Sequence, residues 1–279
     1  MKIRFLISVA FLISFLNMKA QEQFSVDMNL KTEPTSEIDF NETFIGINVN
    51  TKMNTKNTLT NTVQYSNLKV NYETGSFTKF EDLNEFSQLK YTIAIEHEIS
   101  NNTKLNLAIS PIASFQSKVG FSDVALLGRF EISRQFNPST IISIGAARST
   151  IFGTTKFTPV FTLKYKMNTS TELQIGFPNS KLSYSNNSRN NFNLSNSFNG
   201  NYYNLDVIGY PENAKKMTLS QMTSAFEYER NVDKNWFINF KAGYDFNKKY
   251  NLTDHDDHNV YDFNTGDGYL LGIGIKYKL

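Results

Sequence analysis

One acidic segment of the sequence holds the residue types that bind metal ions. Residues 253–258 read TDHDDH, and carboxylate and imidazole groups in a flexible loop bind divalent cations weakly. Beside Asp254, the weak candidate ligands are His255, Asp256, Asp257 and His258. Contiguous polar residues are also typical of a solvated surface loop, so we predict no dedicated metal site and no cofactor.

Nucleophilic catalysis has little support among the reactive side chains. The sequence has 3 histidines and no cysteine, which excludes a disulfide framework and a cysteine nucleophile. Hydrolysis by a membrane enzyme needs a nucleophile, a nearby histidine and an orienting group. Alternation places His97, the histidine outside the acidic segment, on the lipid side near a strand end. We therefore predict no catalytic residues, and an envelope lipid-modifying enzyme is kept as an alternative.

Residues 1–20 are typical of a secretory signal peptide. Lys2 and Arg4 precede an apolar or small stretch over 5–16, and Ala20 is the expected cleavage residue. The alternative is an N-terminal membrane anchor. Beyond residue 20 no stretch approaches the roughly 18 apolar residues that a membrane helix needs. We expect a signal peptide at 1–20 and one domain at 21–279.

Removing the leader changes the charge of the chain. Without Lys2, Arg4 and Lys19 the 28 basic residues become 25, against 26 acidic residues, which gives a formal charge of −1. No basic surface for nucleic acid remains. Hydrophobic residues make up 40% and aromatic residues 14% of the sequence, a mixture that favours a wall with one apolar and one polar face.

The remaining sequence alternates between apolar and polar residues in segments of membrane-strand length. The segment QLKYTIAIEHEI (88–99) places Leu89, Ile93 and Ile95 on one face, with Lys90 and Glu96 on the other. Such alternation over about 9–11 residues is typical of a tilted transmembrane strand. Charged residues facing inward are costly in a packed core but not in a wet lumen.

Inward-facing charges are the candidates for a solute path. They either set the ion preference of a pore or pair with one another and fill the lumen. The predicted lumen-lining residues are Lys90, Glu96, Glu98, Arg129, Glu131, Lys164, Lys166, Lys241 and Asp245.

Short and long connections broadly alternate along the chain, as in outer-membrane barrels. Short Asn-rich turns are predicted at 100–103, 136–140, 167–171, 186–189 and 231–235, and long polar connections at 73–87, 200–216 and 247–266. The pattern predicts an all-β fold: a closed antiparallel transmembrane β-barrel of about 14 strands, with 12 as the alternative. Residues 23–50 and 171–199 give the weakest strand signals.

The final segment, GYLLGIGIKYKL (268–279), alternates to its last residue. Tyr269–Leu279 resembles the carboxy-terminal strand that the outer-membrane assembly machinery recognises, although Leu279 stands where an aromatic residue is usual. We therefore expect that machinery and outer-membrane lipid as partners, with small polar solutes as ligands and no nucleic acid.

The sequence resembles an uncharacterised outer-membrane β-barrel family of Bacteroidota, known as a domain of unknown function similar to DUF6268. The likeness spans most of the mature chain. It is carried by LQIGFPNSKLSYS (173–185), FNGNYYNL (198–205), FINFKAGYDFNKKYNL (237–252) and the final segment. The resemblance implies a Gram-negative outer-membrane barrel and brings no catalytic residues with it.

These observations predict a porin-like, non-enzymatic outer-membrane barrel with a narrow polar lumen. Its expected role is that of a small-solute pore or of a structural and surface-interaction protein. A lipid-modifying enzyme and a secreted soluble β-sandwich are the other classes considered.

Overall fold

The computed structural model describes residues 22–73, 75–206, 211 and 213–279. The strands are β1 (Glu22–Pro34), β2 (Ile38–Lys52), β3 (Asn57–Tyr72), β4 (Glu85–Ser100), β5 (Thr103–Phe115), β6 (Val124–Asn137), β7 (Thr140–Ser149), β8 (Lys156–Lys166), β9 (Thr171–Phe177), β10 (Asn179–Ser185), β11 (Asn190–Asn204), β12 (Lys216–Asp233), β13 (Trp236–Thr253), β14 (Asn259–Asp262) and β15 (Gly268–Lys278). The predicted signal peptide, 1–20, lies outside the described residues.

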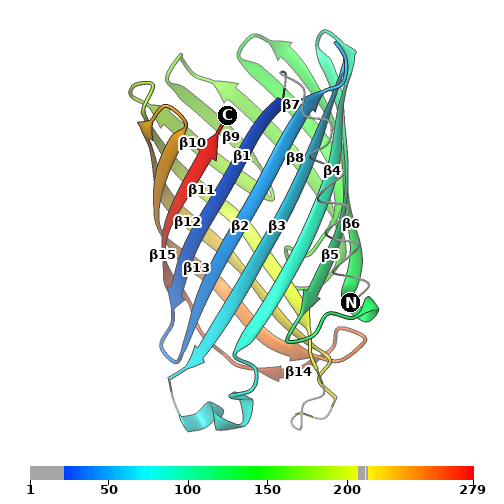
Figure 1. Cartoon of the computed structure of the whole chain (residues 1–279), viewed down its shortest axis with the longest axis vertical. Coiled ribbons are helices and arrows are strands. Elements are labelled where there is room, and N and C mark those ends of the chain that lie inside the picture. Colours follow the sequence, from blue (N-terminus) through cyan, green and yellow to red (C-terminus); the bar gives the residue numbers. More distant parts are fainter. Residues whose placement is uncertain (1–21, 74, 207–210, 212) are drawn as a thin grey trace.

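The strands form a closed antiparallel barrel of 14 strands (Figure 1). Neighbours in sequence pair around the ring from β1 to β13, β13 pairs with β15, and β15 returns to β1 over the register Ser25↔Lys278 to Thr32↔Leu271. The short β14 pairs only with the end of β13. Closure leaves no free edge strand, so the backbone groups of the ring pair within the wall except in the loop-end stretch beside β9 and β10. The predicted fold and the larger strand count are confirmed.

Alternation within each strand separates an apolar outer face from an inner face. On β15 the side chains of Tyr269, Leu271, Ile273 and Ile275 are 47–69% exposed, whereas Leu270 is 2% exposed. Each of the 14 wall strands carries at least one exposed large apolar residue. Successive side chains of a strand point to opposite faces, so this apolar band encircles the barrel.

The two ends of the barrel differ in the length of their connections (Figure 1). At one end, called here the turn end, two to four residues join consecutive strands, at 53–56, 101–102, 138–139, 167–170, 186–189 and 234–235. β1 begins and β15 ends there. The opposite end, the loop end, carries the longest connections, which confirms the predicted alternation. The predicted long connections are shorter than expected, because β11 continues to Asn204 and β13 to Thr253.

Helical structure in the described residues is confined to two 3-10 turns at the loop end, η1 (Gly75–Phe80) and η2 (Phe121–Asp123). None of the described helical segments has the length and apolar character needed to cross a membrane.

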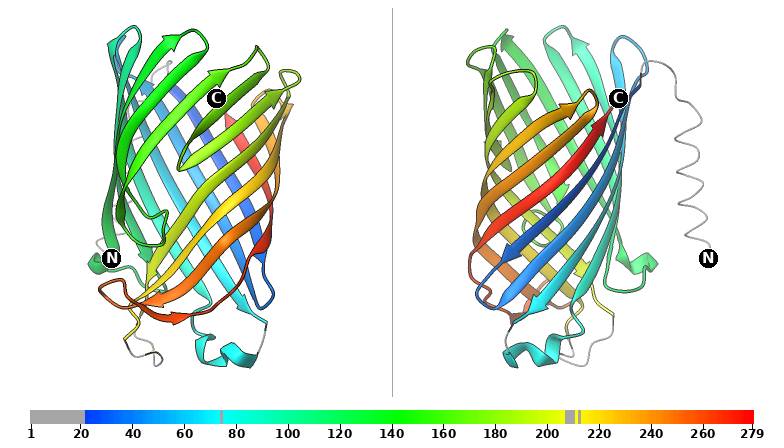
Figure 2. Two further views of the ribbon diagram at one scale, coloured as in Figure 1. Left: turned by 180° about the vertical axis from the view of Figure 1, so that it is seen from behind. Right: turned by 60° about the vertical axis from the view of Figure 1, so that its left-hand side comes forward.

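The wall is not uniform in height. β9 and β10 have 7 residues each, and their hairpin begins at the turn end and ends partway along the barrel (Figure 2). Beyond that hairpin β11 turns toward β5, where Asn204 pairs with Phe115. The rings of Phe86 on β4 and Tyr203 on β11 lie 5.3 Å apart. The interior is therefore narrower at the loop end.

Candidate functional site

A polar pocket of about 340 Å³ lies on the inner face of β4 to β9, and is called here the β4–β9 pocket. Its lining is Glu96, Lys104, Asn106, Arg129, Glu131, Ser133, Ile141, Ser143, Thr162, Lys164 and Gln174. Lys104 Nζ lies 2.6 Å from Glu96 Oε1 and 3.4 Å from Glu98 Oε1. The Arg129 guanidinium pairs with the Glu131 carboxylate, two residues along the same strand face. These pairs leave Lys164 as the lining cation without an ion pair among the described residues.

Lys164 belongs to a row that crosses three strands. Strand pairing places Gln174 on β9 opposite Lys164 on β8, and opposite Lys181 on β10. Directly paired residues lie on the same face, so both lysines point inward beside one amide. Neither lysine forms an ion pair within the described part of the chain. The row is a local excess of positive charge at the wall of the pocket.

A second polar pocket, of about 330 Å³, lies on the inner face of β12, β13, β15, β1 and β2. Lys241 and Glu227 face each other across β12 and β13 in it, and both line its wall. Lys276, another lining residue, reaches Glu229 at 3.4 Å. The two pockets place charged groups of both signs along the inner face toward the turn end.

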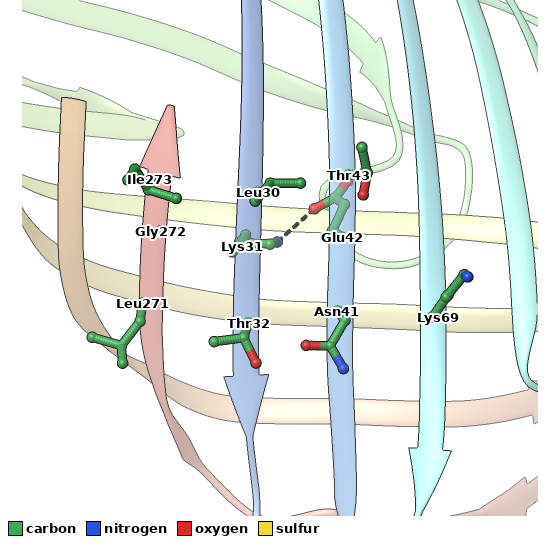
Figure 3. Close-up of a pocket in the computed structure, with 10 residues that line it drawn as sticks. All are labelled: Leu30, Lys31, Thr32, Asn41, Glu42, Thr43, Lys69, Leu271, Gly272 and Ile273. Atoms are coloured by element: carbon green, nitrogen blue, oxygen red, sulfur yellow. Dashed lines mark ion pairs between the residues drawn. The ribbon is translucent and has the colours of Figure 1, made fainter. Parts of the chain in front are cut away.

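Deeper along the barrel, ion pairs become more buried. Glu33 Oε2 lies 2.9 Å from Lys248 Nζ, and the two side chains are 1% and 0% exposed. Lys31 Nζ joins them, 2.9 Å from Glu33 Oε1 and 2.7 Å from Glu42 Oε2. Asp245 Oδ2 lies 3.4 Å from Lys248 Nζ. The Lys31–Glu42 pair bridges neighbouring strands beneath an outer-face groove of about 490 Å³ (Figure 3). We call these five residues the buried ion network.

Neutral side chains complete the buried ion network. Gln221 Nε2 donates to Glu33 Oε1 at 3.0 Å, and Thr223 Oγ1 donates to Asp245 Oδ1 at 2.6 Å. Lys248 Nζ also lies 4.6 Å from the centre of the Phe40 ring. A buried charge is tolerated when it is paired and hydrogen-bonded. The network thereby ties β1, β2, β12 and β13 together.

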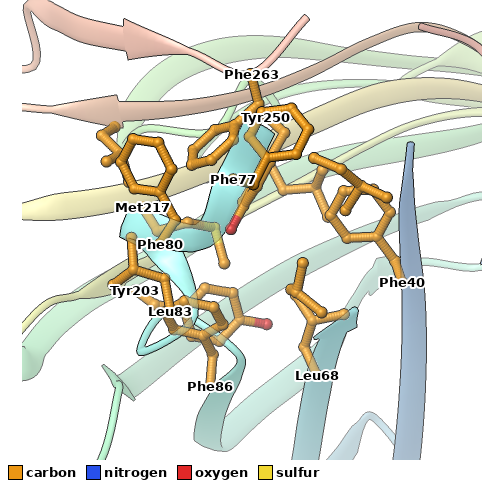
Figure 4. Close-up of a cluster of buried hydrophobic side chains, with 14 of the residues drawn as sticks. Phe40, Leu68, Phe77, Phe80, Leu83, Phe86, Tyr203, Met217, Tyr250 and Phe263 are labelled. Carbon is orange, nitrogen blue, oxygen red and sulfur yellow. The ribbon is translucent and has the colours of Figure 1, made fainter. Parts of the chain in front are cut away.

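Next to Phe40, the inner face toward the loop end is packed with apolar side chains (Figure 4). This aromatic plug consists of Ile38, Phe40, Leu68, Val70, Phe77, Phe80, Leu83, Phe86, Tyr203, Ala214, Met217, Leu219, Tyr250, Leu252 and Phe263. The Tyr250 and Phe263 rings stack at 4.3 Å, and Phe80 meets Phe263 at 4.9 Å. Phe77 and Phe80 come from η1, so side chains of a loop-end connection pack into the plug. The predicted narrow polar lumen is thus polar only toward the turn end.

The predicted lumen residues fall into several environments. Four of the nine, Glu96, Arg129, Glu131 and Lys164, line the β4–β9 pocket, and Lys241 lines the second pocket. Glu98 pairs with Lys104 beside the β4–β9 pocket. Asp245 belongs to the buried ion network. Lys90 faces Ile112 across β4 and β5, and Lys166 faces Glu172 across β8 and β9.

Sequence reasoning missed most of the buried ion network. Asp27, Asn29, Lys31 and Glu33 occur at every second position of β1, which was the available signal. That signal fell in the region 23–50, where the strand prediction was weakest. Lys248 was missed because 247–266 was read as a connection.

The acidic segment does not assemble a ligand set. Asp254 Oδ1 accepts the backbone N–H groups of Asp256 and His258, each at 2.9 Å, and Asp254 Oδ2 lies 3.3 Å from His258 Nδ1. Asp257 pairs with Lys216 at 2.7 Å. Over the described residues no group of three or more His, Asp or Glu side chains is placed to hold a metal ion. His97 Nδ1 contacts the amide oxygen of Asn57 at 2.8 Å, on the outer face of β4.

Together, the closed wall, the apolar outer face and the polar inner pockets define a porin-like β-barrel. The family model of a domain of unknown function (DUF6268) matches residues 17–278, and the chain belongs to that family. The expected resemblance to DUF6268 is confirmed. No curated protein matches the sequence.

Solved structures with a similar fold include channel proteins with little sequence identity. The COG4313 outer membrane channel from Pseudomonas putida F1 aligns with a TM-score of 0.52 and 5% identity, over 94% of this chain and 97% of that one. The KdgM porin in complex with disordered oligogalacturonate has a TM-score of 0.41 and 7% identity, covering 91% and 98% of the two chains. A mutant of the TodX monoaromatic hydrocarbon channel has a TM-score of 0.46 and 9% identity, over 94% of this chain and 91% of that one. At this identity the likeness extends to the fold alone.

Proposed function

We propose that the protein is a non-enzymatic channel of the outer membrane that passes small solutes and is closed at rest toward its loop end. The observation that carries this proposal is the change along the inner face, from charged pockets near the turn end to the aromatic plug. Open polar pockets suit a solute path, whereas a packed apolar cluster blocks one. The fold shared with the COG4313 outer membrane channel supports the proposal.

The outer face supports a membrane location. An exposed apolar band on all 14 wall strands is unfavourable in water and favourable against lipid. Short turns are typical of the periplasmic side of such barrels and long loops of the outside. We therefore orient the turn end toward the periplasm and the plug toward the exterior. Export requires a leader, which we assign to residues 1–20 with cleavage after Ala20.

Two assays test the location. Membrane fractionation should recover the chain with the outer membrane, and a detergent gel should show heat-modifiable migration of the folded barrel. Mass measurement of the mature chain should give an N-terminus at Gln21. Recovery of the chain in the soluble fraction would contradict the membrane assignment.

Planar-bilayer recording tests the channel. Wild-type protein should conduct weakly, and the double variant F77A/F263A should conduct several-fold more, because Phe77 and Phe263 are 5% and 3% exposed in the plug. The matched control is F121A, since Phe121 is an 89% exposed loop-end phenylalanine. Flat traces from both wild type and F77A/F263A would instead support a structural or surface-interaction barrel.

The partner expected from the sequence is part of the proposal. β15 presents Tyr269, Leu271, Ile273, Ile275 and Tyr277 on its outer face, which suits recognition by the outer-membrane assembly machinery. The variant Y277S should lower the yield of heat-modifiable barrel in cells without preventing refolding in detergent micelles. Unchanged assembly in cells would remove this partner.

A further inference from the structure

At the loop end, one stretch of the barrel wall has no strand pairing. It lies between the facing edges of β8 and β11. β8 pairs with β9 from Phe161↔Phe177 to Lys166↔Glu172, so residues 156–160 have no partner on that side. β11 pairs with β10 over 191–197; beyond that, on the same side, the Phe198 N–H donates to the Pro178 carbonyl at 3.1 Å and Asn204 pairs with Phe115 on β5. Between these edges the wall holds no β-ladder.

The connection between β7 and β8, residues 150–155, fills this unpaired stretch by packing. Thr150 Oγ1 donates to the Gly200 carbonyl at 2.8 Å, the one hydrogen bond that joins 150–155 to β11 in the described structure. A Cβ on Gly200 would lie 2.6 Å from the carbonyl oxygens of both Thr150 and Ile151, so the absent side chain permits the close approach. Gly153, with φ of +78°, packs against Thr218.

Three phenylalanines cover the tip of the β9–β10 hairpin. The ring centres of Phe152 and Phe198 lie 6.1 Å apart, those of Phe152 and Phe177 6.2 Å, and those of Phe177 and Phe198 5.3 Å. Phe152 is 45% exposed, so the cluster stands at the surface of the barrel. We call these residues the phenylalanine seal.

The lateral seal is weaker than the axial one. Opening the loop end exposes a plug of 15 buried residues, including the stacked Tyr250 and Phe263. Opening the wall between β8 and β11 separates three phenylalanines and breaks at most two hydrogen bonds, from Thr150 to Gly200 and from Phe198 to Pro178, with no ladder to break. The free-energy cost of opening scales with the apolar area exposed and the hydrogen bonds lost, so the lateral route costs less.

Behind the phenylalanine seal the inner face carries two lysines that form no ion pair in the described part of the chain. Lys164 and Lys181 flank Gln174 on the inner face, three residues before Phe177, which corresponds to about 10 Å along the strand at ~3.3 Å per residue. A solute that uses both features carries an anionic head for the lysines and an apolar body for the phenylalanines.

We infer that the unpaired stretch between β8 and β11 is a lateral passage, through which a small amphipathic anion moves between the lumen and the surrounding membrane. The inference rests on the proposed channel function and names its route and its solute class. The anionic head crosses the hydrocarbon region inside the barrel, while the apolar body leaves through the opened phenylalanine seal. Carboxylate, sulfonate and phosphate heads share this chemistry.

Stapling the seal tests the route. The chain has no cysteine, so F152C/F198C introduces the only two thiols. Proteoliposomes should pass octanesulfonate, whose permanent charge slows its crossing of lipid. A bifunctional ethane-linked methanethiosulfonate should reduce that flux at least tenfold, and dithiothreitol should restore it. The matched control is F192C/F226C on the fully paired wall, whose rings lie 6.3 Å apart. Stapling the control should leave the flux unchanged.

Charge reversal tests the solute class. K164E/K181E should invert the preference for octanesulfonate over octyltrimethylammonium, whereas K118E/K234E makes the same change in charge in exposed connections between strands and should not. Heat-modifiable migration in a gel confirms that each variant is folded. If F152C/F198C fails to fold, the charge-reversal experiment alone tests the inference. Octanesulfonate flux that persists through the staple, or a preference unaltered in K164E/K181E, overturns the inference. Failure of the proposed channel is distinct: methanesulfonate and octanesulfonate would then both fail to cross.

Discussion

Glu33 and Lys248 are 215 residues apart in the sequence and form an ion pair of 2.9 Å with almost no exposure to solvent. The pair joins β1 to β13 across β15, at the level where the polar inner face meets the plug. Burial removes both charges from water, so each depends on the other for compensation.

Lys248→Met should destabilise the barrel. Removing one partner of a buried pair costs about 3–5 kcal/mol, and Lys31 still compensates Glu33, so we expect a loss of about 3 kcal/mol. Urea unfolding in detergent micelles measures it. In the triple variant E33Q/D245N/K248M neither partner of Lys248 keeps a buried charge and Lys31 still pairs with Glu42, so part of the loss should return. Equal stability of K248M and wild type would contradict the role of the pair.

Tyr72→Phe should loosen the plug. The Tyr72 hydroxyl donates to the Leu83 carbonyl at 3.0 Å and lies 2.7 Å from the Tyr250 hydroxyl. Its loss leaves buried polar atoms without a partner, which costs about 1–3 kcal/mol. We expect lower unfolding free energy and more frequent opening in single-channel records. Y65F, on the outer face of the same strand, is the control, and a matching response in Y65F would show that the effect is not specific to the plug.

Lys104→Gln should shift the channel toward cations. Lys104 neutralises Glu96 and Glu98 in the β4–β9 pocket, and its loss leaves two carboxylates without that cation. The reversal potential in a potassium chloride gradient, recorded in the F77A/F263A background, reports the shift. Lys69→Gln makes the same change in charge on the outer face of β3 and should leave the potential unaltered. An unchanged potential in K104Q would place the ion path elsewhere.

Gly200→Ala should displace the 150–155 segment. The new Cβ would lie 2.6 Å from two backbone oxygens, whereas at Gly272 the nearest atoms are 3.5 Å away. We therefore expect G200A, and not G272A, to speed maleimide labelling of F152C several-fold. Equal labelling rates would mean that the segment does not depend on close approach to β11.

The turn at Asp254 should weaken in acid. Backbone hydrogen bonding from His258, followed by that from Asp256, holds the pKa of Asp254 below its ordinary value of 3.8. A carboxyl whose folded pKa is depressed stabilises the turn above its unfolded pKa, and that contribution is lost as pH falls through the folded pKa. The hydrogen-exchange protection of the Asp256 and His258 amides, corrected for the pH dependence of the intrinsic exchange rate, should fall as the pH drops through the folded pKa of Asp254. In D254N the same protection should not change with pH, and a parallel fall in that variant would exclude Asp254 as the titrating group.

Sequence alone predicted the wall of the barrel better than its contents. Segments 88–99 and 268–279 alternate so regularly that one face must be apolar, and the structure confirms both as strands. The side chains of Phe40, Leu68 and Tyr250 face inward although they are apolar. Apolar residues on the inner face weaken the apolar–polar alternation from which the two faces of a strand are predicted. The plug was therefore not predicted.

The buried contacts depend on register and on curvature, which a single strand does not encode. Glu33 meets Gln221 across 188 residues because the wall bends β1 toward β12. Lys164 and Lys181 become neighbours only when β9 and β10 are counted as real strands, in a region where the strand signal was weak. Alternation identifies the inner face, but not which inner residues meet.

The seven-residue strands β9 and β10 also affect the bilayer around the protein. At ~3.3 Å per residue and a tilt of about 40°, such a strand covers roughly 18 Å of membrane thickness, less than the ~25 Å apolar band typical of these barrels. β2 and β3, with 15 and 16 residues, are tall enough on the other side of the ring. Lipid adjusts to such hydrophobic mismatch by thinning locally or by letting the protein tilt. The membrane is therefore expected to be thinnest beside the β9–β10 hairpin. This gives the barrel a preferred direction of tilt and a preferred side for contact with other membrane proteins.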